Sequence, residues 1–254
     1  MKIILMCPSC GIDGLQLKED KSGPVFPEVE LDQWPLFYEY TCKNGHQNVH
    51  TIQTELYELL FQQGTYCIMD GYYREAIGTY NAALERFFEY VIEIIFLTKN
   101  HNLEFEKLWK EVRNQSERQL GAFYFLWSYH FGEYPQFLDT NIVSIRNNVI
   151  HKGQLVSKKE AKEFGQYIFS YIRGLQNKLN ELLGEELMLS SMARNYRLLE
   201  PKLSKISPDQ IIVNSSIPNF LNSENIKNLD DCVLQDIPTQ YCKEKVHTFA
   251  PEIF

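Results

Sequence analysis

The chain has 254 residues, of which 44% are hydrophobic and 13% aromatic, and its formal net charge is −8. This length suits one medium domain with one or two small attachments, and the apolar fraction excludes a wholly disordered protein. A protein that coats nucleic acid is normally basic, so the acidic balance confines any contact with RNA to a local surface. The sequence contains neither a secretory pattern nor an apolar run of about 20 residues, which predicts a cytoplasmic protein without a membrane span.

Two short turns rich in ligand-type side chains predict a metal site in residues 1–52. Cys7 and Cys10 form a Cys-x-x-Cys pair, and Cys42 and His46 lie in a second turn. Zinc prefers four tetrahedral sulfur or nitrogen ligands, which two such turns can supply. In a cytoplasmic protein, close cysteine pairs indicate metal ligands or redox groups rather than disulfides, and the βαβ setting of a thioredoxin-like pair is absent.

The predicted metal is a structural zinc that stabilises a zinc ribbon over residues 1–52. Strands are expected around the two turns, from Val25 to Leu31 and from Phe37 to Tyr40. A piece of this size has too small a core to fold alone, so the metal would supply most of its stability. A closed site with four protein ligands leaves no position for catalysis. His50 is a rival for the fourth ligand position.

Residues 53–189 are predicted to form a helical bundle, because their apolar residues recur every three or four positions. Capping-box patterns that begin at Ser116 and at Ser157 indicate two helix starts, and Pro135 is expected in the first turn of another helix. The expected helices run from Glu55 to Met69, Tyr72 to Leu97, Leu103 to Arg113, Ser116 to Phe131, Pro135 to Gly153 and Ser157 to Leu183.

Residues 190–254 are expected to form an irregular C-terminal extension. Pro, Asn and Ser become common past Leu189, and the helical spacing of apolar residues is lost. A strand is expected from Ile211 to Val213, and the segment carries no motif that assigns it a role. The predicted fold class is therefore mainly α, with a helical bundle, a small N-terminal zinc ribbon and this extension.

The expected helix from Pro135 to Gly153 carries the candidate catalytic residues. Asn147 and His151 are four positions apart and share one helix face, whereas Arg146 lies about 140° from His151 around an ideal helix. Arg146 and His151 are therefore expected to meet only at an irregular helix end or across two copies of the chain. The surrounding segment, Ile142 to Lys178, is locally basic, with seven Lys or Arg against two Glu.

The order of Arg146, Asn147 and His151, followed by a glycine and a capped final helix, resembles the signature of the HEPN family. That signature is an Arg followed within a few residues by a His, often with Asn directly after the Arg. The long helix upstream, with Glu75 and Glu85, is also similar to the first long HEPN helix. The resemblance covers roughly residues 53–185.

The resemblance implies a homodimeric helical bundle that acts as a metal-independent RNA endonuclease, with Arg146, Asn147 and His151 as catalytic residues. An imidazole can take the proton of a ribose 2′-hydroxyl, and an arginine can hold the phosphate by charge and paired hydrogen bonds. The products would carry 2′,3′-cyclic phosphate and 5′-hydroxyl ends, and DNA would not be cut. The residues expected to bind the RNA backbone are Lys152, Lys158 and Lys159.

The family resemblance further implies a toxin or an effector of antiviral defence, held by an antitoxin or a larger defence complex. The same residues allow other interpretations. Arg146 could form a structural ion pair with Glu85, His151 could cap helix carbonyls, and the lysines could simply solvate their helix. A catalytically silent HEPN adaptor would keep the same core. A tetratricopeptide scaffold would need about three repeats, and the sequence shows one.

Overall fold

The structure is a computed structural model that describes residues 2–4, 7, 28–30, 33–42, 44–207, 211–215, 221, 227–230 and 246–248. The described part is mainly helical, as expected, and none of its helices is both long and apolar enough to cross a membrane. The chain divides into two compact units. The first comprises Met1–Thr54, Arg197–Pro218 and Gln235–Phe254, and the second comprises Glu55–Tyr196 and Asn219–Leu234.

The first unit contains two three-stranded sheets, and a strand from late in the chain completes each of them. In the sheet β2-β1-β6, β1 pairs antiparallel with β2 and parallel with β6. In the sheet β3-β4-β5, β4 pairs antiparallel with β3 and parallel with β5. The strands are β1 (Lys2–Ile4), β2 (Glu28–Glu30), β3 (Leu36–Thr41), β4 (Gln47–Ile52), β5 (Ile211–Ser215) and β6 (Val246–Thr248).

Two of the expected strands are confirmed, namely the one at Phe37 to Tyr40 and the one at Ile211 to Val213. The strand expected from Val25 to Leu31 appears as β2, and its remaining residues lie outside the described ones. A small apolar cluster of Phe37, Val49 and Leu199 packs on the second sheet. The C-terminal residues therefore form part of these sheets, through pairings that no local sequence pattern indicates.

The expectation of irregular structure from residue 190 is wrong in part, because α8 (Glu185–Leu203) occupies much of that stretch. From Met188 to Arg194 its pattern is inverted relative to an ordinary surface helix. Ser190 and Arg194 are buried, whereas Met188 and Met192 are exposed. Since helix prediction relies on apolar residues facing inward, this inversion hides the helix from a periodicity argument.

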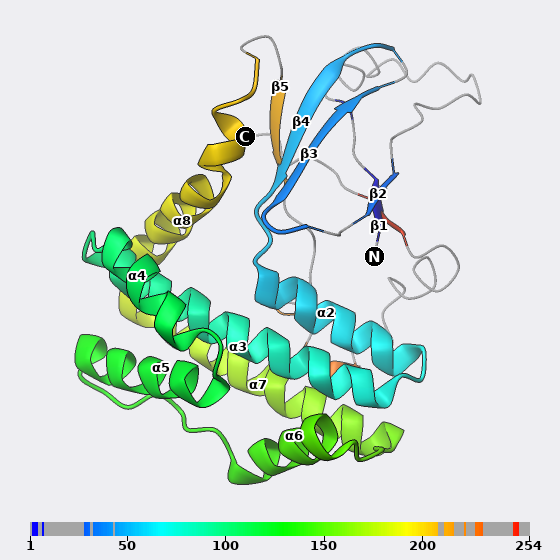
Figure 1. Ribbon diagram of the computed structural model, residues 1–254, viewed down its shortest axis with the longest axis vertical. Helices are drawn as coiled ribbons and strands as arrows, with labels where there is room; N and C mark the ends of the chain where they lie inside the picture. The colour runs from blue at the N-terminus through cyan, green and yellow to red at the C-terminus, as the bar shows by residue number, and fades with distance from the viewer. Residues whose placement is uncertain are drawn as a thin grey trace. The chain divides into compact units, whose positions relative to one another are not determined.

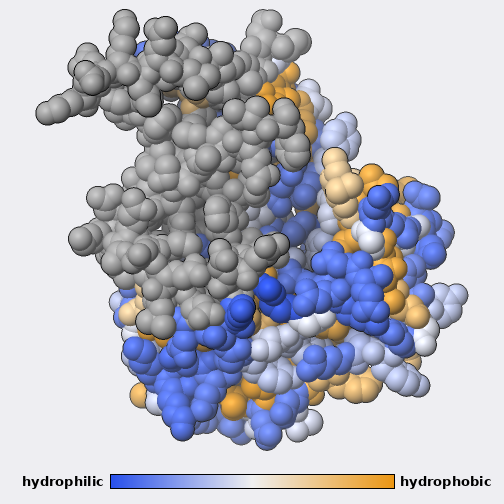
Figure 2. All heavy atoms as spheres, turned by 180° about the vertical axis from the view of Figure 1, so that it is seen from behind, coloured by the Kyte–Doolittle hydropathy of each residue, from blue (hydrophilic) through white to orange (hydrophobic). Residues whose placement is uncertain are grey.

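The second unit is a helical bundle arranged around α3, which packs against α2, α4, α5, α6 and α7 (Figure 1). Its amphipathic spacing buries a stripe that includes Ile77, Leu84 and Phe87. Figure 2 shows the opposite face, where hydrophilic side chains cover most of the described surface and hydrophobic ones form smaller areas. The helices are α2 (Leu56–Met69), α3 (Tyr73–Thr98), α4 (Asn102–Val112), α5 (Ser116–Phe131), α6 (Thr140–Lys152) and α7 (Lys158–Leu183).

The expectation that Pro135 opens a helix is wrong, because residues 132–139 form a loop and α6 begins at Thr140. Three tyrosine hydroxyls hold this loop. The backbone N–H groups of Leu138 and Asp139 each donate to a tyrosine hydroxyl at 2.8 Å, and a third hydroxyl donates to the Gln136 carbonyl at 2.6 Å. These bonds satisfy backbone groups that a helix would otherwise have paired. The tyrosines are Tyr124, Tyr167 and Tyr171.

The two capping-box predictions have different outcomes. The box at Ser157 is confirmed, since its hydroxyl accepts a hydrogen bond from the Glu160 N–H at 3.3 Å and the Glu160 carboxylate accepts from the Ser157 N–H at 2.7 Å. The box at Ser116 is wrong, because the N-cap of α5 is Gln115. The Ser116 hydroxyl donates instead to Glu85 of α3. A tertiary partner has therefore taken the place of a local cap.

Tyr80 of α3 is fully buried between two glycines, which lets α2 and α7 approach α3 closely. A Cβ at Gly64 of α2 would lie 2.8 Å from Tyr80 Cδ1, and one at Gly165 of α7 would lie 2.6 Å from Tyr80 Cε2. Neither distance is compatible with a real Cβ in a close-packed interior. The Tyr80 hydroxyl is 3.0 Å from the Thr65 hydroxyl, so its polar atom is also satisfied.

A buried ionic cluster links α8 to α3 and to the residue before α2. Arg194 of α8 donates from Nε to Glu93 Oε2 at 2.7 Å and from Nη1 to Glu55, and its guanidinium carbon lies 5.6 Å from the Tyr90 ring centroid. All three charged side chains are buried. Burial raises the pKa of the Glu55 carboxyl, and the charge of Arg194 opposes that rise. The guanidinium therefore compensates two carboxyl groups in a dry environment.

We expect Gly165→Ala to destabilise the protein by about 1–3 kcal/mol, because the added methyl group must displace the Tyr80 ring. Gly121→Ala in α5 is the matched control, since a Cβ there meets nothing within 4 Å. Removing backbone freedom in a helix should make that variant more stable by about 0.5–1 kcal/mol. Urea unfolding measures both values, and equal effects would contradict the role given to Tyr80.

Arg194→Met should cost about 3–5 kcal/mol of folding free energy at neutral pH, because two carboxyl groups lose their buried partner. Without Arg194, the folded-state pKa of the Glu55 carboxyl rises further above its unfolded value. The contribution of Glu55 to stability is then present at low pH and lost as pH rises, so the deficit should shrink in mildly acidic buffer. Arg74→Met, which removes an exposed ion pair with Glu75, should cost less than about 1 kcal/mol.

Candidate functional site

Arg146 of α6 lies at the centre of a polar cluster that also includes side chains of α3 and α5. Its Nη2 donates to Ser116 Oγ at 2.6 Å and to Glu85 Oε1 at 3.3 Å. Ser116 donates to the same carboxylate oxygen at 2.5 Å, and Asn81 Nδ2 donates to it at 2.8 Å. The carboxylate thus accepts three hydrogen bonds at one oxygen, which holds the guanidinium in one orientation.

The other end of the Arg146 guanidinium contacts both remaining residues of the sequence motif. Nη1 donates to Asn147 Oδ1 at 2.7 Å and lies 3.4 Å from His151 Nε2. Neither an irregular helix end nor a second copy is needed for this meeting. α6 stays helical through Lys152 and ends at Gly153 with φ 67°. The extended arginine side chain spans the angle that separates the two positions.

The contact between Arg146 and His151 depends on which ring nitrogen of the imidazole carries the proton. A guanidinium can only donate, so the 3.4 Å contact is a hydrogen bond only in the tautomer whose Nε2 is unprotonated. In that tautomer the proton is on Nδ1 and the Nε2 lone pair faces the cation. His151 is exposed, whereas the Arg146 side chain is 13% exposed. The arrangement therefore presents an accessible proton acceptor beside a partly buried positive charge.

A small hollow adjoins the Arg146 cluster and limits how a ligand can approach it. The hollow has a volume of about 70 Å³, which is room for a few water molecules at most. A nucleotide does not fit inside, so a substrate would have to approach from the exposed edge at His151. The polar residues that line the hollow are Asn81, Glu85, Ser116, Glu117 and Arg146.

Cys7, Cys42 and His46 form a group that could hold a metal ion, and their ligand atoms lie within 4.8 Å of one another. His46 Nδ1 is 3.6 Å from Cys7 Sγ and 3.4 Å from Cys42 Sγ. Cys42 and His46 flank the turn between β3 and β4, where the Cys42 N–H donates to the His46 carbonyl at 3.0 Å. Gly45 in this turn has φ 83°, which favours glycine.

The remaining predicted ligands have different outcomes. Cys10 lies outside the described residues. His50 does not belong to the described ligand group, and its Nε2 lies 3.2 Å from the Tyr40 hydroxyl. Asn48, which the sequence did not single out, donates to Cys7 Sγ at 3.4 Å and to the His46 carbonyl at 3.0 Å. A donor aimed at a sulfur suits a thiolate ligand and orients it.

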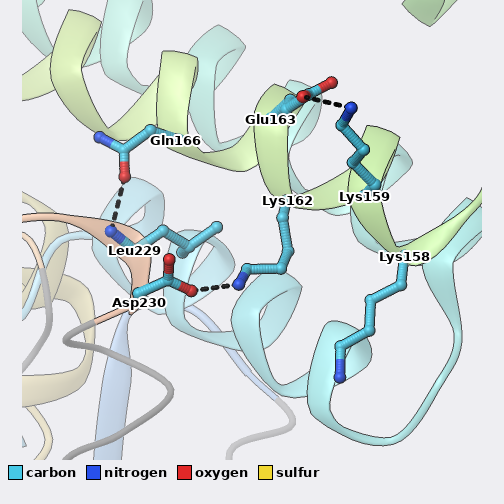
Figure 3. A pocket seen from close by; sticks show the side chains of 7 residues that line it. All are labelled: Lys158, Lys159, Lys162, Glu163, Gln166, Leu229 and Asp230. Atoms are coloured by element: carbon cyan, nitrogen blue, oxygen red, sulfur yellow. Dashed lines mark hydrogen bonds and ion pairs between the residues drawn. The ribbon is translucent and has the colours of Figure 1, made fainter.

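The three lysines predicted to bind RNA lie at the end of α6 and the start of α7. Lys152 is exposed and directly follows His151 in the chain. Lys158 and Lys159 help to line an open hollow of about 650 Å³, which is drawn in Figure 3. This hollow and the one beside Arg146 share no lining residue. Lys158 and Lys159 are therefore near the motif in sequence but line a different part of the surface.

Comparisons with protein-family models, with curated proteins and with solved structures found no match to this chain.

Proposed function

We propose that the chain is a HEPN-type, metal-independent RNA endonuclease. The observation that supports this most is the hydrogen-bonded group of Arg146, Asn147 and His151, in which an exposed imidazole offers its lone pair beside a guanidinium. Ribonucleases that use the 2′-hydroxyl of their substrate need a proton acceptor and a cation that can stabilise a phosphorane. Both are available here without a metal.

In the proposed reaction His151 Nε2 takes the proton of a ribose 2′-hydroxyl, and the resulting oxygen attacks the adjacent phosphorus. The new P–O2′ bond forms as the P–O5′ bond breaks. A second acid then protonates the leaving 5′-oxygen. The products are a 2′,3′-cyclic phosphate and a 5′-hydroxyl end, and the enzyme returns to its starting state once His151 has released its proton to water and the acid has regained one.

Arg146 would stabilise the extra negative charge that develops on the phosphate. Glu85 and Ser116 hold its Nη2, which leaves Nη1, on the side of His151, as the group that would contact the substrate. The Nη1 contact with His151 is long, at 3.4 Å, so a phosphate oxygen can replace it at small cost. Asn147 would then bind a phosphate oxygen or orient the imidazole. Lys152, Lys158 and Lys159 would guide the RNA backbone.

A homodimer would bring a second His151 to act as the acid for the leaving oxygen. Large aromatic side chains are exposed on α5 and on the loop between α5 and α6, which is the kind of surface that protein partners cover. Because the loop is held by three tyrosine hydroxyls, these side chains project from a fixed backbone. The exposed aromatic residues are Phe125, Tyr129, Tyr134 and Phe137.

We further propose that Cys7, Cys10, Cys42 and His46 bind one structural zinc ion and form a zinc ribbon. Zinc would hold the β3–β4 turn and the N-terminal segment together, and with all four ligands in place it would have no catalytic position. Asn48 would support the Cys7 thiolate. By resemblance, the protein would act in the cytoplasm as a toxin or antiviral-defence effector, restrained by an antitoxin or a complex partner.

One observation favours a second candidate function, a catalytically silent HEPN adaptor. Arg146 is already bound by Glu85, Ser116 and Asn147, so the ion pair could be purely structural. An adaptor would need the same packing and would use the exposed aromatic residues for a partner protein. Measuring RNA cleavage separates the two functions.

Arg146→Ala and His151→Ala should each lower the rate of RNA cleavage by at least about 100-fold, since each removes a group that acts on the reacting atoms. Cleavage of labelled RNA in buffer with EDTA measures the rate, and circular dichroism checks that the bundle still folds. His101→Ala is the control, because that exposed histidine lies on a different surface turn near Glu104. Variants at both motif positions that cut at the wild-type rate would refute the site.

Purified protein should contain about one zinc ion per chain, because the two turns supply four ligands to a single site. Cys42→Ser should lose most of this metal and melt at a lower temperature, whereas Cys67→Ser on α2 should keep it. Elemental analysis of the three proteins gives the answer. Wild-type protein without metal, or equal metal content in both variants, would rule out the zinc proposal.

A further inference from the structure

Three described residues from the C-terminal part of the chain, Leu221, Leu229 and Asp230, each contact α7. Arg173 Nη1 donates to the Leu221 carbonyl at 2.8 Å, and the Leu229 N–H donates to Gln166 Oε1 at 2.7 Å. The third contact is an ion pair between Lys162 and Asp230 (Figure 3). From Leu221 to Asp230 these contacts shift toward the N-terminus of α7, and Leu229 and Asp230 line the hollow formed with the lysines.

Leu229 is the anchor that fixes the position of Asp230. Its side chain is buried, and its Cδ2 lies 2.9 Å from the place where a Cβ would stand at Gly165. A larger residue at Gly165 would therefore push Leu229 away. Because the backbone N–H of Leu229 also donates to Gln166 Oε1, the residue before Asp230 is fixed by both its side chain and its backbone.

The lysines at the start of α7 point in two directions. Lys158 and Lys162 are four positions apart and extend to the same side of the helix, where Asp230 also lies (Figure 3). Lys159 turns the other way, and its Nζ is 3.8 Å from the Glu163 carboxylate. Within the described part of the chain, Lys158 forms no ion pair. Of the three lysines that line the hollow, Lys158 and Lys162 thus extend to one side, and the Asp230 carboxylate pairs with Lys162.

We infer that Lys158 and Lys162 form a binding site for the phosphates of a single RNA strand, and that Asp230 is an internal competitor for it. The inference rests on the proposed function for the identity of the ligand as RNA. Two lysines on one helix face can contact successive phosphates as point charges. Asp230 is 59% exposed in its side chain, so a phosphate can displace it without a large desolvation cost.

In this arrangement Asp230 lowers the affinity of the site for RNA. The carboxylate neutralises Lys162 in the unbound protein and must leave before both lysines can act together. An exposed ion pair is weak, so the pair of Asp230 with Lys162 reduces RNA binding without abolishing it. A partner protein that draws Leu229 and Asp230 away from α7 would free Lys162. RNA binding would then depend on that partner.

The test measures binding of the full chain to a short fluorescein-labelled 2′-O-methyl RNA strand by fluorescence anisotropy at low salt. The methyl group blocks 2′-hydroxyl attack, so binding is measured without cleavage. Asp230→Asn should tighten binding about two- to fivefold, because the competing charge is gone. Glu133→Gln is the matched control, since Glu133 pairs with Lys178 on the same helix at 3.3 Å. It should leave the affinity unchanged.

A double-mutant cycle assigns the effect to the site. Lys162→Met should remove the gain that Asp230→Asn produces, because no second ammonium group remains to be released. A gain that persists in the Lys162→Met background, equal gains in the Glu133→Gln control, or no gain at all would overturn the inference. If the cycle holds but RNA is not cleaved, the binding site stands and the proposed enzyme activity fails; the reverse result refutes the binding site alone.

Discussion

The contact of Tyr80 with Gly64 and Gly165 is the constraint on which the helical unit depends. It lets three helices pack so closely that one aromatic ring fills the space between them. Because Tyr80 points into this contact, the next positions on α3 turn toward α5 and α6. Asn81 and Glu85 stand there, and they form the base of the Arg146 cluster. The packing of Tyr80 therefore sets the orientation of α3, and with it the positions of Asn81 and Glu85 at the candidate site.

Helix α3 contributes a glutamate to each of two separate polar clusters. Glu85 is partly exposed and binds Arg146, whereas Glu93 is fully buried and binds Arg194. In the buried cluster the guanidinium is enclosed by carboxylates and an aromatic ring, so it can only stabilise the fold. In the other cluster one guanidinium nitrogen reaches an exposed imidazole. This difference in access is the physical reason to place function at Arg146 and not at Arg194.

Much of the helical unit could be predicted from sequence, because α3 and α7 bury regular apolar stripes that periodicity detects. α8 was missed since its buried face holds Ser190 and Arg194. The pairings of β5 and β6 could not be predicted from the sequence for another reason. Their parallel partner strands lie far away in the chain, and such pairs leave no local sequence pattern.

The candidate site shows the same division between local and distant information. The spacing of Arg146, Asn147 and His151 marked them in advance, and so did the spacing of Cys42 and His46. Ser116 was misread as a cap, because its local pattern fits one and its partner Glu85 lies 31 positions earlier. Asn48 carries no signal of its own, and only its contact with Cys7 reveals its role.

The central claim is that an imidazole and a guanidinium of this chain promote attack by a ribose 2′-hydroxyl. The most direct measurement maps the ends produced from a defined RNA in EDTA, then repeats the reaction with one 2′-deoxyribose placed at the mapped position. The account predicts 2′,3′-cyclic phosphate ends in the first reaction and no cut at that position in the second. Cleavage at the 2′-deoxy position, or activity that stops when metal is chelated, would contradict it.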